Sequence, residues 1–143
     1  MKILRTLLVA VPLITAPWLR AETDQTANSY NGRAWRTFSI EQKLGWLGGY
    51  RDGLQVGLVA ACGSQQPSGC LETAHNKLIP TGLTNQEVIE WIDDFYAPPE
   101  NRLIPVWDAL GTLCGKTNGD STQETERKID RSRATWATRS QGK

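Results

Sequence analysis

The sequence predicts an all-α protein, organised as a small single-domain bundle of three main helices with an accessory helix or tail. Two stretches match a capping box, in which Ser or Thr is answered three residues later by Gln or Glu: Ser39 with Gln42, and Thr84 with Glu87. Apolar residues recur at helical spacing after both stretches. The length of 143 residues suits one domain with its own core.

The amino terminus predicts export. Lys2 and Arg5 precede an apolar run from Leu7 to Trp18, and small residues allow cleavage after Ala21. This pattern is typical of a secretory signal peptide over residues 1–21. A membrane anchor is the alternative, but two prolines and an arginine interrupt the run, and a span needs roughly 20 apolar residues. We therefore expect a periplasmic or secreted chain with no membrane span after signal removal.

Charge excludes one class of partner. Loss of residues 1–21 removes 3 of the 16 basic residues and leaves 13 against 15 acidic ones, a formal charge of −2. Nucleic-acid binding would need a clustered basic excess, so no nucleic-acid partner is expected.

Residues 22–38 are largely polar and are predicted to form an irregular lead-in.

The first main helix is predicted from about Ile40 to Ala61. It contains five glycines, each of which costs about 1 kcal/mol relative to alanine in a helix interior. They are Gly45, Gly48, Gly49, Gly53 and Gly57. Four of them recur every fourth residue, and we interpret them as a groove against which the rest of the domain packs closely. A kink at "GGYRDG" is the alternative. A membrane-type GxxxG dimer is not expected, because Arg51 and Asp52 interrupt the stretch.

Two further helices follow a loop-like segment that contains a candidate short helix at residues 71–78. The second main helix is predicted over Asn85 to Tyr96 and ends before Pro98. The third begins at Pro105, which suits a first helical turn, and ends near Gly115. These boundaries define a helical core domain at residues 39–116.

The segment 117–143 is polar and rich in alternating charge. Ser121 can begin a helix that extends to about Ala137, with Trp136 as its one large apolar residue. Because such a helix would have little to bury, we expect a polar charged tail that is partly helical or frayed.

Cysteine spacing favours a disulfide over a metal site. Cys62 and Cys70 close a short loop that contains Gly and Pro, so their pairing is the simplest in an oxidising compartment, with Cys114 free and buried. Pairings of Cys114 with either of the others stay open. His75 is the only histidine and the chain has no CxxC pair, so neither a metal site nor a cofactor is expected.

Catalysis is not predicted. Glu87, Glu90, Asp93 and Asp94 crowd the second helix, where carboxylates are expected on the solvated face of an amphipathic helix. A small hydrolase that uses a pair of these groups is the alternative, and it requires Glu90 or Asp94 to face a cleft. No GxSxG, GxGxxG or P-loop pattern is present.

Tryptophan content favours a binding protein, because Trp and Arg dominate interface hot spots. Five tryptophans follow the leader: Trp46 and Trp107 are assigned to the core, and Trp35, Trp91 and Trp136 are held as surface anchors. Arg51 lies beside Tyr50 at the edge of the apolar face, where it borders a pocket or pairs with an acid of the second helix. Asp108 is a candidate partner for Arg51 or Arg102. The candidate binding residues are Trp35, Tyr50, Arg51, Trp91 and Arg102.

Three stretches carry a family resemblance: Trp35, Phe38 and Ser39 with Lys43, then "GYRDG" from Gly49, then "FYAPPENRLIPVWDAL" from Phe95. Over residues 31–114 the chain resembles small exported bacterial proteins of unassigned function. More distantly, it is similar to the helical immunity proteins of the Rap1a/Tai type. The resemblance implies an all-helical, exported protein that binds toxin-like effectors, and it transfers no catalytic residue.

The sequence therefore predicts an exported helical protein-binding module, of the immunity or inhibitor type, rather than an enzyme. A structural accessory of the cell envelope that self-associates, for example as a homodimer, is the alternative. The disulfide partner of Cys62, the oligomeric state and the identity of the partner are left open by the sequence.

Overall fold

A computed structural model describes residues 25–26, 29–63, 69, 78–80 and 82–141 of the chain. Within them the protein is all-α, as predicted, with a two-residue antiparallel hairpin as its only sheet: β1 (Gln25–Thr26) pairs with β2 (Ser29–Tyr30). Three predicted features lie outside the described residues: the signal peptide, Cys70, and all of the candidate helix at 71–78 except Leu78.

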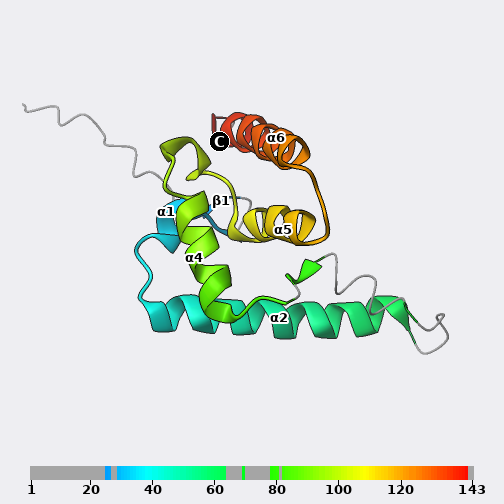
Figure 1. Ribbon diagram of the computed structural model, residues 1–143. Helices are drawn as coiled ribbons and strands as arrows, with labels where there is room; N and C mark the ends of the chain where they lie inside the picture. The colour runs from blue at the N-terminus through cyan, green and yellow to red at the C-terminus, as the bar shows by residue number, and fades with distance from the viewer. Residues whose placement is uncertain (1–24, 27–28, 64–68, 70–77, 81, 142–143) are drawn as a thin grey trace, which may run out of the picture.

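In the described part of the chain, six helical elements follow the hairpin. They are α1 (Gly32–Trp35), α2 (Ile40–Cys62), α4 (Asn85–Phe95), the 3₁₀ turn η1 (Pro99–Asn101), α5 (Val106–Thr117) and α6 (Thr122–Gln141). Figure 1 shows α2 along one side of the molecule, with α4 rising away from it. Helix α5 lies beside α4 and above α2, and α6 lies above α5, farthest from α2.

The two predicted capping boxes form. Ser39 and Gln42 cap α2, and Thr84 and Glu87 cap α4, with both reciprocal hydrogen bonds present in each case. These caps satisfy backbone N–H groups that a helix start leaves without an intrahelical partner. The beginnings of both helices are therefore confirmed at the predicted residues.

The core lies where α4 and α5 meet α1, α2 and α6. Trp35, Tyr96 and Ile104 are fully buried, and the Tyr96 hydroxyl donates to the Ile104 carbonyl over 2.9 Å. Trp35 also donates its indole N–H to Asp93 Oδ1 over 2.7 Å, and the Lys43 ammonium contacts the same carboxylate at 2.7 Å. Trp35 is thus a core residue, and its assignment as a surface anchor is wrong.

The lead-in is more ordered than predicted. Residues 25–35 contain the β1–β2 hairpin and α1, which Asn31 caps through hydrogen bonds to the amides of Arg33 and Ala34. Asn31 also donates its side-chain amide to the buried Thr26 hydroxyl over 2.9 Å. These side-chain hydrogen bonds fix a segment that its polar composition predicted to be irregular.

The glycines of α2 do not form a close-packed groove. A Cβ atom built on any of the five would have no described neighbour within 4 Å, and α2 runs unbroken through all of them. At about 100° per residue, all five glycines lie roughly 80° or more around the helix from the buried Leu47 and Leu58, so they do not sit on the face that packs in the core. Both the close packing and the proposed break at "GGYRDG" are wrong.

Close approach occurs instead at two other glycines. A Cβ on Gly32 would overlap the ring of Tyr96, and one on Gly115 would overlap the side chains of Asp120 and Lys128, which form an ion pair. Gly32 lets α1 approach α4, and Gly115 lets the turn between α5 and α6 fold back on α5.

The helix predicted to begin at Ser121 is present as α6, but it packs in the core, so the expectation of a frayed tail with little to bury is wrong. Helix α6 packs on α5 and η1, and places Ile129 and Trp136 in the core. Trp136 is only 4% exposed and donates its indole N–H to Asp108 Oδ2 over 2.6 Å. Trp107, which was assigned to the core, is 42% exposed and packs edge-on against the Trp136 ring. The surface and core assignments of these two tryptophans are therefore exchanged.

Candidate functional site

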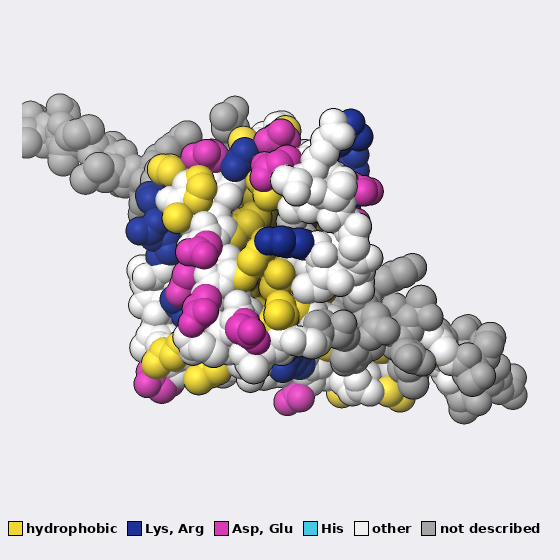
Figure 2. Space-filling model, in the orientation of Figure 1, with side chains coloured by type: hydrophobic (Ala, Val, Ile, Leu, Met, Phe, Trp, Pro, Cys, Tyr) yellow, Lys and Arg dark blue, Asp and Glu magenta, His cyan; other side chains and the backbone are white. Residues whose placement is uncertain are grey.

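A groove of about 460 Å³ lies between α4, η1, α5 and α6, and we call it the α4–α6 groove. Its lining is Trp91, Asp94, Phe95, Pro98, Asn101, Lys116, Asp120, Thr122, Thr125, Glu126, Ile129 and Arg133. Figure 2 shows hydrophobic side chains gathered on this face of the molecule, flanked by acidic side chains and crossed by a basic one. The groove thus combines an apolar floor with a charged border.

The aromatic part of the floor comes from α4. The rings of Trp91 and Phe95 stack with their centroids 5.2 Å apart and their planes 26° apart. Phe95 is buried, whereas Trp91 is only partly buried. The indole ring of Trp91 is thus held against Phe95, and both side chains line the groove.

The border carries two sets of paired charges. Lys128 and Asp120 form an ion pair at the start of α6. Arg133 donates to Asn101 Oδ1 over 2.7 Å and to Asp130 Oδ1 over 3.0 Å, and lies 3.8 Å from Glu100. These contacts join α6 to η1 and to its own preceding turn, so Asp120 and Arg133 mainly hold the walls of the groove together.

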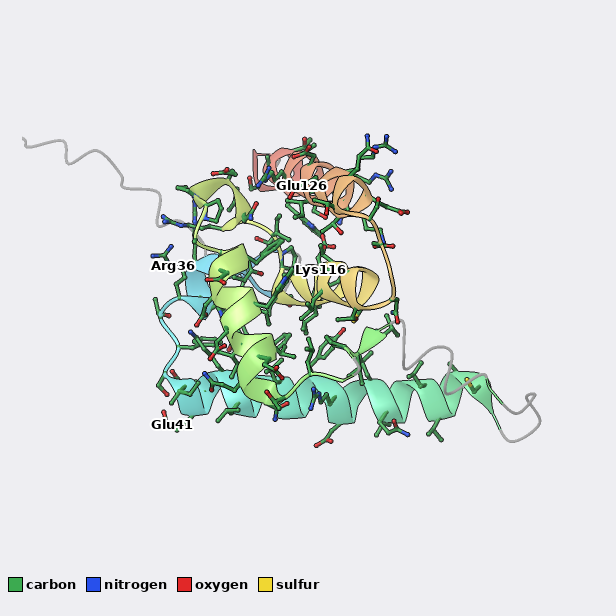
Figure 3. The ribbon with its side chains drawn as sticks, in the orientation of Figure 1. Arg36, Glu41, Lys116 and Glu126 are labelled. Carbon is green, nitrogen blue, oxygen red and sulfur yellow. The ribbon has the colours of Figure 1, made fainter. Side chains whose placement is uncertain are left out.

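Three other charged groups of the border have no hydrogen bond or ion pair with the described residues. They are the carboxylates of Asp94 and Glu126 and the ammonium of Lys116. Figure 3 shows Lys116 between α4 and α5, with Glu126 on α6 beyond it. The hydroxyl of Thr125, a residue 8% exposed, is also buried without a described partner. The groove therefore holds three solvent-exposed charged groups and one buried hydroxyl, none of which has a described protein partner.

The acidic face of α4 divides into groups with different contacts. Glu87 belongs to the capping box, Glu90 accepts from the Gln86 amide over 2.9 Å, and Asp93 is bound by Trp35 and Lys43. Asp94 alone of these carboxylates lines the groove. The hydrolase alternative required Glu90 or Asp94 to face a cleft, and of these two residues only Asp94 lines the groove.

A second, smaller groove of about 360 Å³ runs along one flank of α2. It is lined by Gly49, Tyr50, Gly53, Leu54, Gly57 and Leu58. Tyr50 stacks on Trp46 with ring centroids 5.2 Å apart, and burial raises the pKa of its phenol to about 12. On other sides of the same helix, Val56 is 70% exposed and Val59 is 53% exposed. Three of the five glycines that were predicted to pack closely, Gly49, Gly53 and Gly57, thus line an open apolar groove.

The predicted binding residues do not converge. Trp91 lines the α4–α6 groove, Tyr50 lines the α2 groove, and Trp35 is buried. Arg51 is half-buried and forms no ion pair with a described residue. Arg102 is half-buried with its Nε atom lacking a described partner, and Asp108 binds Trp136 instead of either arginine.

Sequence reasoning missed the α5 and α6 side of the groove, including Lys116, Thr125 and Glu126. A signal for it was present, because Thr125, Ile129 and Trp136 recur at helical spacing and are the buried residues of α6. The polar composition of the segment obscured this narrow apolar stripe.

Cys114 is a buried free thiol, and burial raises its pKa to about 11. Cys62 is disulfide-bonded, while its predicted partner Cys70 lies outside the described residues, so the Cys62–Cys70 pairing stays a prediction. Within the described ranges no three His, Cys, Asp or Glu residues are grouped to hold a metal ion. None of the described helices has the length and apolar character needed to cross a membrane.

Comparison of the chain with protein-family models, curated proteins and solved structures finds no match. The likeness to Rap1a/Tai-type immunity proteins is therefore an untested hypothesis.

Proposed function

We propose that this chain is an exported protein-binding module whose partner docks in the α4–α6 groove. The observation that carries the proposal is the partly exposed indole of Trp91, which stacks on Phe95 and lines a groove with a charged border. Protein interfaces combine an apolar, aromatic centre with a polar rim, and Trp is the residue most enriched among their hot spots.

Export and inhibitor function are further parts of the same proposal. The leader pattern at residues 1–21 supports a periplasmic or secreted location. The resemblance to exported immunity proteins supports a toxin-like enzyme as the partner, which this module would block by binding. A hydrolase that uses Asp94 is the competing enzymatic hypothesis, and it predicts turnover that Asp94→Asn abolishes.

Affinity capture from envelope extracts of the producing cells and of neighbouring strains tests the proposal, with the full chain as bait. Trp91→Ala removes the indole from the groove. Trp107→Ala is the matched control, because it removes an indole that is 42% exposed but lies outside the groove lining. The expected result is a stoichiometric partner that is lost with Trp91→Ala and kept with Trp107→Ala, with both variants helical by circular dichroism. Equal retention by both variants would contradict docking in the groove.

Self-association is a second candidate function, because α2 exposes Val56 and Val59 and, on another side, carries an open apolar groove. Sedimentation of the full chain across a concentration series tests it. A dimer that Val56→Lys dissociates would support an envelope accessory that binds its own copies.

A further inference from the structure

We propose that the α4–α6 groove receives an arginine side chain of the partner polypeptide. This inference rests on the proposed function and specifies the chemistry of the group that is bound. It follows from the charges that remain unpaired in the groove, from the partly exposed indole of Trp91 and from the buried Thr125 hydroxyl in the same lining.

The first step is the balance of charge. Of the five charged residues that line the groove, Asp120 is paired with Lys128, and Arg133 is engaged by Asp130 and Asn101. The remaining groups are the two carboxylates of Asp94 and Glu126 and the single ammonium of Lys116. The unpaired charge is therefore negative by one unit, which favours a cationic occupant.

The second step is the aromatic surface. A cation placed over the face of a Trp ring is attracted by the negative charge of its π system, and Trp provides the strongest such site. The Trp91 ring already stacks on Phe95, so it is held in place before a ligand arrives. An indole and two unpaired carboxylates in one groove together favour a cation with an extended apolar stem.

The third step distinguishes arginine from lysine. A guanidinium is planar, stacks on an aromatic face and carries five N–H donors in a fixed plane, whereas an ammonium is a compact and strongly hydrated point charge. Asp94 and Glu126 lie on different helices, and the buried Thr125 hydroxyl offers a further acceptor with no described partner. A group with several donors is suited to acceptors that are divided in this way.

Lys116 has a defined role in this arrangement. Its ammonium lies in the same groove as the two carboxylates and carries the charge of the expected ligand (Figure 3). It therefore repels an incoming cation and competes for the carboxylates. Lys116→Ala should raise the affinity for a cationic ligand, in contrast to the acidic substitutions.

The test is a nuclear magnetic resonance titration of the full chain with blocked Gly-Arg-Gly peptide. The matched probes are the same peptide with citrulline, which is neutral and nearly isosteric, and with glutamate. Amide shifts are expected at residues 91–98 and 116–129 with the arginine peptide, at an affinity about tenfold or more above that of the citrulline peptide. Preferential binding of the glutamate peptide, or equal binding of arginine and citrulline, would overturn the inference.

Variants locate the binding group. Asp94→Asn and Glu126→Gln should each weaken the arginine peptide about tenfold. Glu90→Gln should leave it unchanged, because this carboxylate lies on the same helix but outside the groove lining. Loss of binding in Glu90→Gln to the same extent would contradict the inference.

The captured partner separates this inference from the proposed function. A partner that is lost with Trp91→Ala but retained with Asp94→Asn and Glu126→Gln would overturn the arginine chemistry and leave the binding function standing. Selective binding of the arginine peptide with no partner in any extract would support the groove chemistry and count against the protein-binding function.

Discussion

The glycines of this chain provide a sharp test of how its helices pack. Gly53 lies in α2 with no described atom within 4 Å of the position of a Cβ atom, whereas a Cβ on Gly32 would overlap the Tyr96 ring. Gly53→Ala should therefore stabilise the fold by about 1 kcal/mol, the difference in helix propensity between the two residues. Gly32→Ala should destabilise it, although the substitution itself is the same.

The magnitude for Gly32→Ala follows from what the methyl group displaces. The Tyr96 side chain is fully buried, and its hydroxyl donates to the Ile104 carbonyl over 2.9 Å, so the ring has no free space into which it can move. Overpacking of a filled core costs about 1–3 kcal/mol, and loss of the hydrogen bond adds about 1 kcal/mol. After a gain of up to about 1 kcal/mol from helix propensity, a net loss of about 2 kcal/mol is expected.

Urea denaturation followed by circular dichroism and by tryptophan fluorescence gives both free energies of unfolding. Opposite signs for the two variants are expected. Destabilisation by Gly53→Ala would refute the reasoning, because it would mean that another part of the protein packs on the glycine face of α2. A Gly32→Ala variant within about 0.5 kcal/mol of wild type would contradict the packing of α1 on Tyr96.

Three further predictions concern tryptophan, acid and thiol groups. Trp136→Ala should lower the unfolding free energy by about 3–5 kcal/mol, as expected for a buried aromatic residue, and Trp107→Ala should lower it by clearly less. Equal losses in urea denaturation would contradict the burial of Trp136 and the exposure of Trp107. Hydrogen bonds from the Thr84 cap hold the pKa of Glu87 below its usual 4.5. The contribution of Glu87 to stability is therefore present above pH 4.5 and is lost as the pH falls further. Glu87→Gln should flatten the dependence of the unfolding free energy on pH between about pH 7 and pH 3, and an unchanged dependence would refute this prediction. Cys114, with its pKa raised to about 11, should react with Ellman's reagent only after unfolding; if Cys62 is paired as predicted, a single thiol then reacts rather than all three.

Local signals in the sequence were sufficient for the helices that carry caps. Ser39 and Thr84 begin α2 and α4 because a capping box satisfies orphan backbone groups through residues only three positions apart. Pro105 similarly precedes α5, which starts at the next residue. Such interactions depend on the adjacent chain alone, so they can be read without knowledge of the fold.

Tertiary contacts decided the features that were predicted wrongly. Trp35, Trp107 and Trp136 have the same side chain, and their burial depends on which helix packs over them. Trp136 is buried because α6 lies on α5, where Asp108 accepts its indole N–H. The polar composition of residues 117–143 gave no reason to expect this packing.

The candidate site was predicted only on its α4 side, at Trp91. The opposite wall requires α6 to fold back on α5, which depends on the turn after Gly115 and on the Asp120–Lys128 ion pair that covers it. The binding groove is thus formed by two segments whose association the sequence pattern did not predict.

Docking of a partner in the α4–α6 groove is tested most directly by amide hydrogen exchange of the full chain, alone and bound to the captured partner. The account predicts slowed exchange in the bound chain at residues 91–101 and 116–133, and no change at residues 49–58 of α2. Protection confined to the α2 segment, with the α4 and α6 segments unchanged, would contradict the claim that this groove is the binding site.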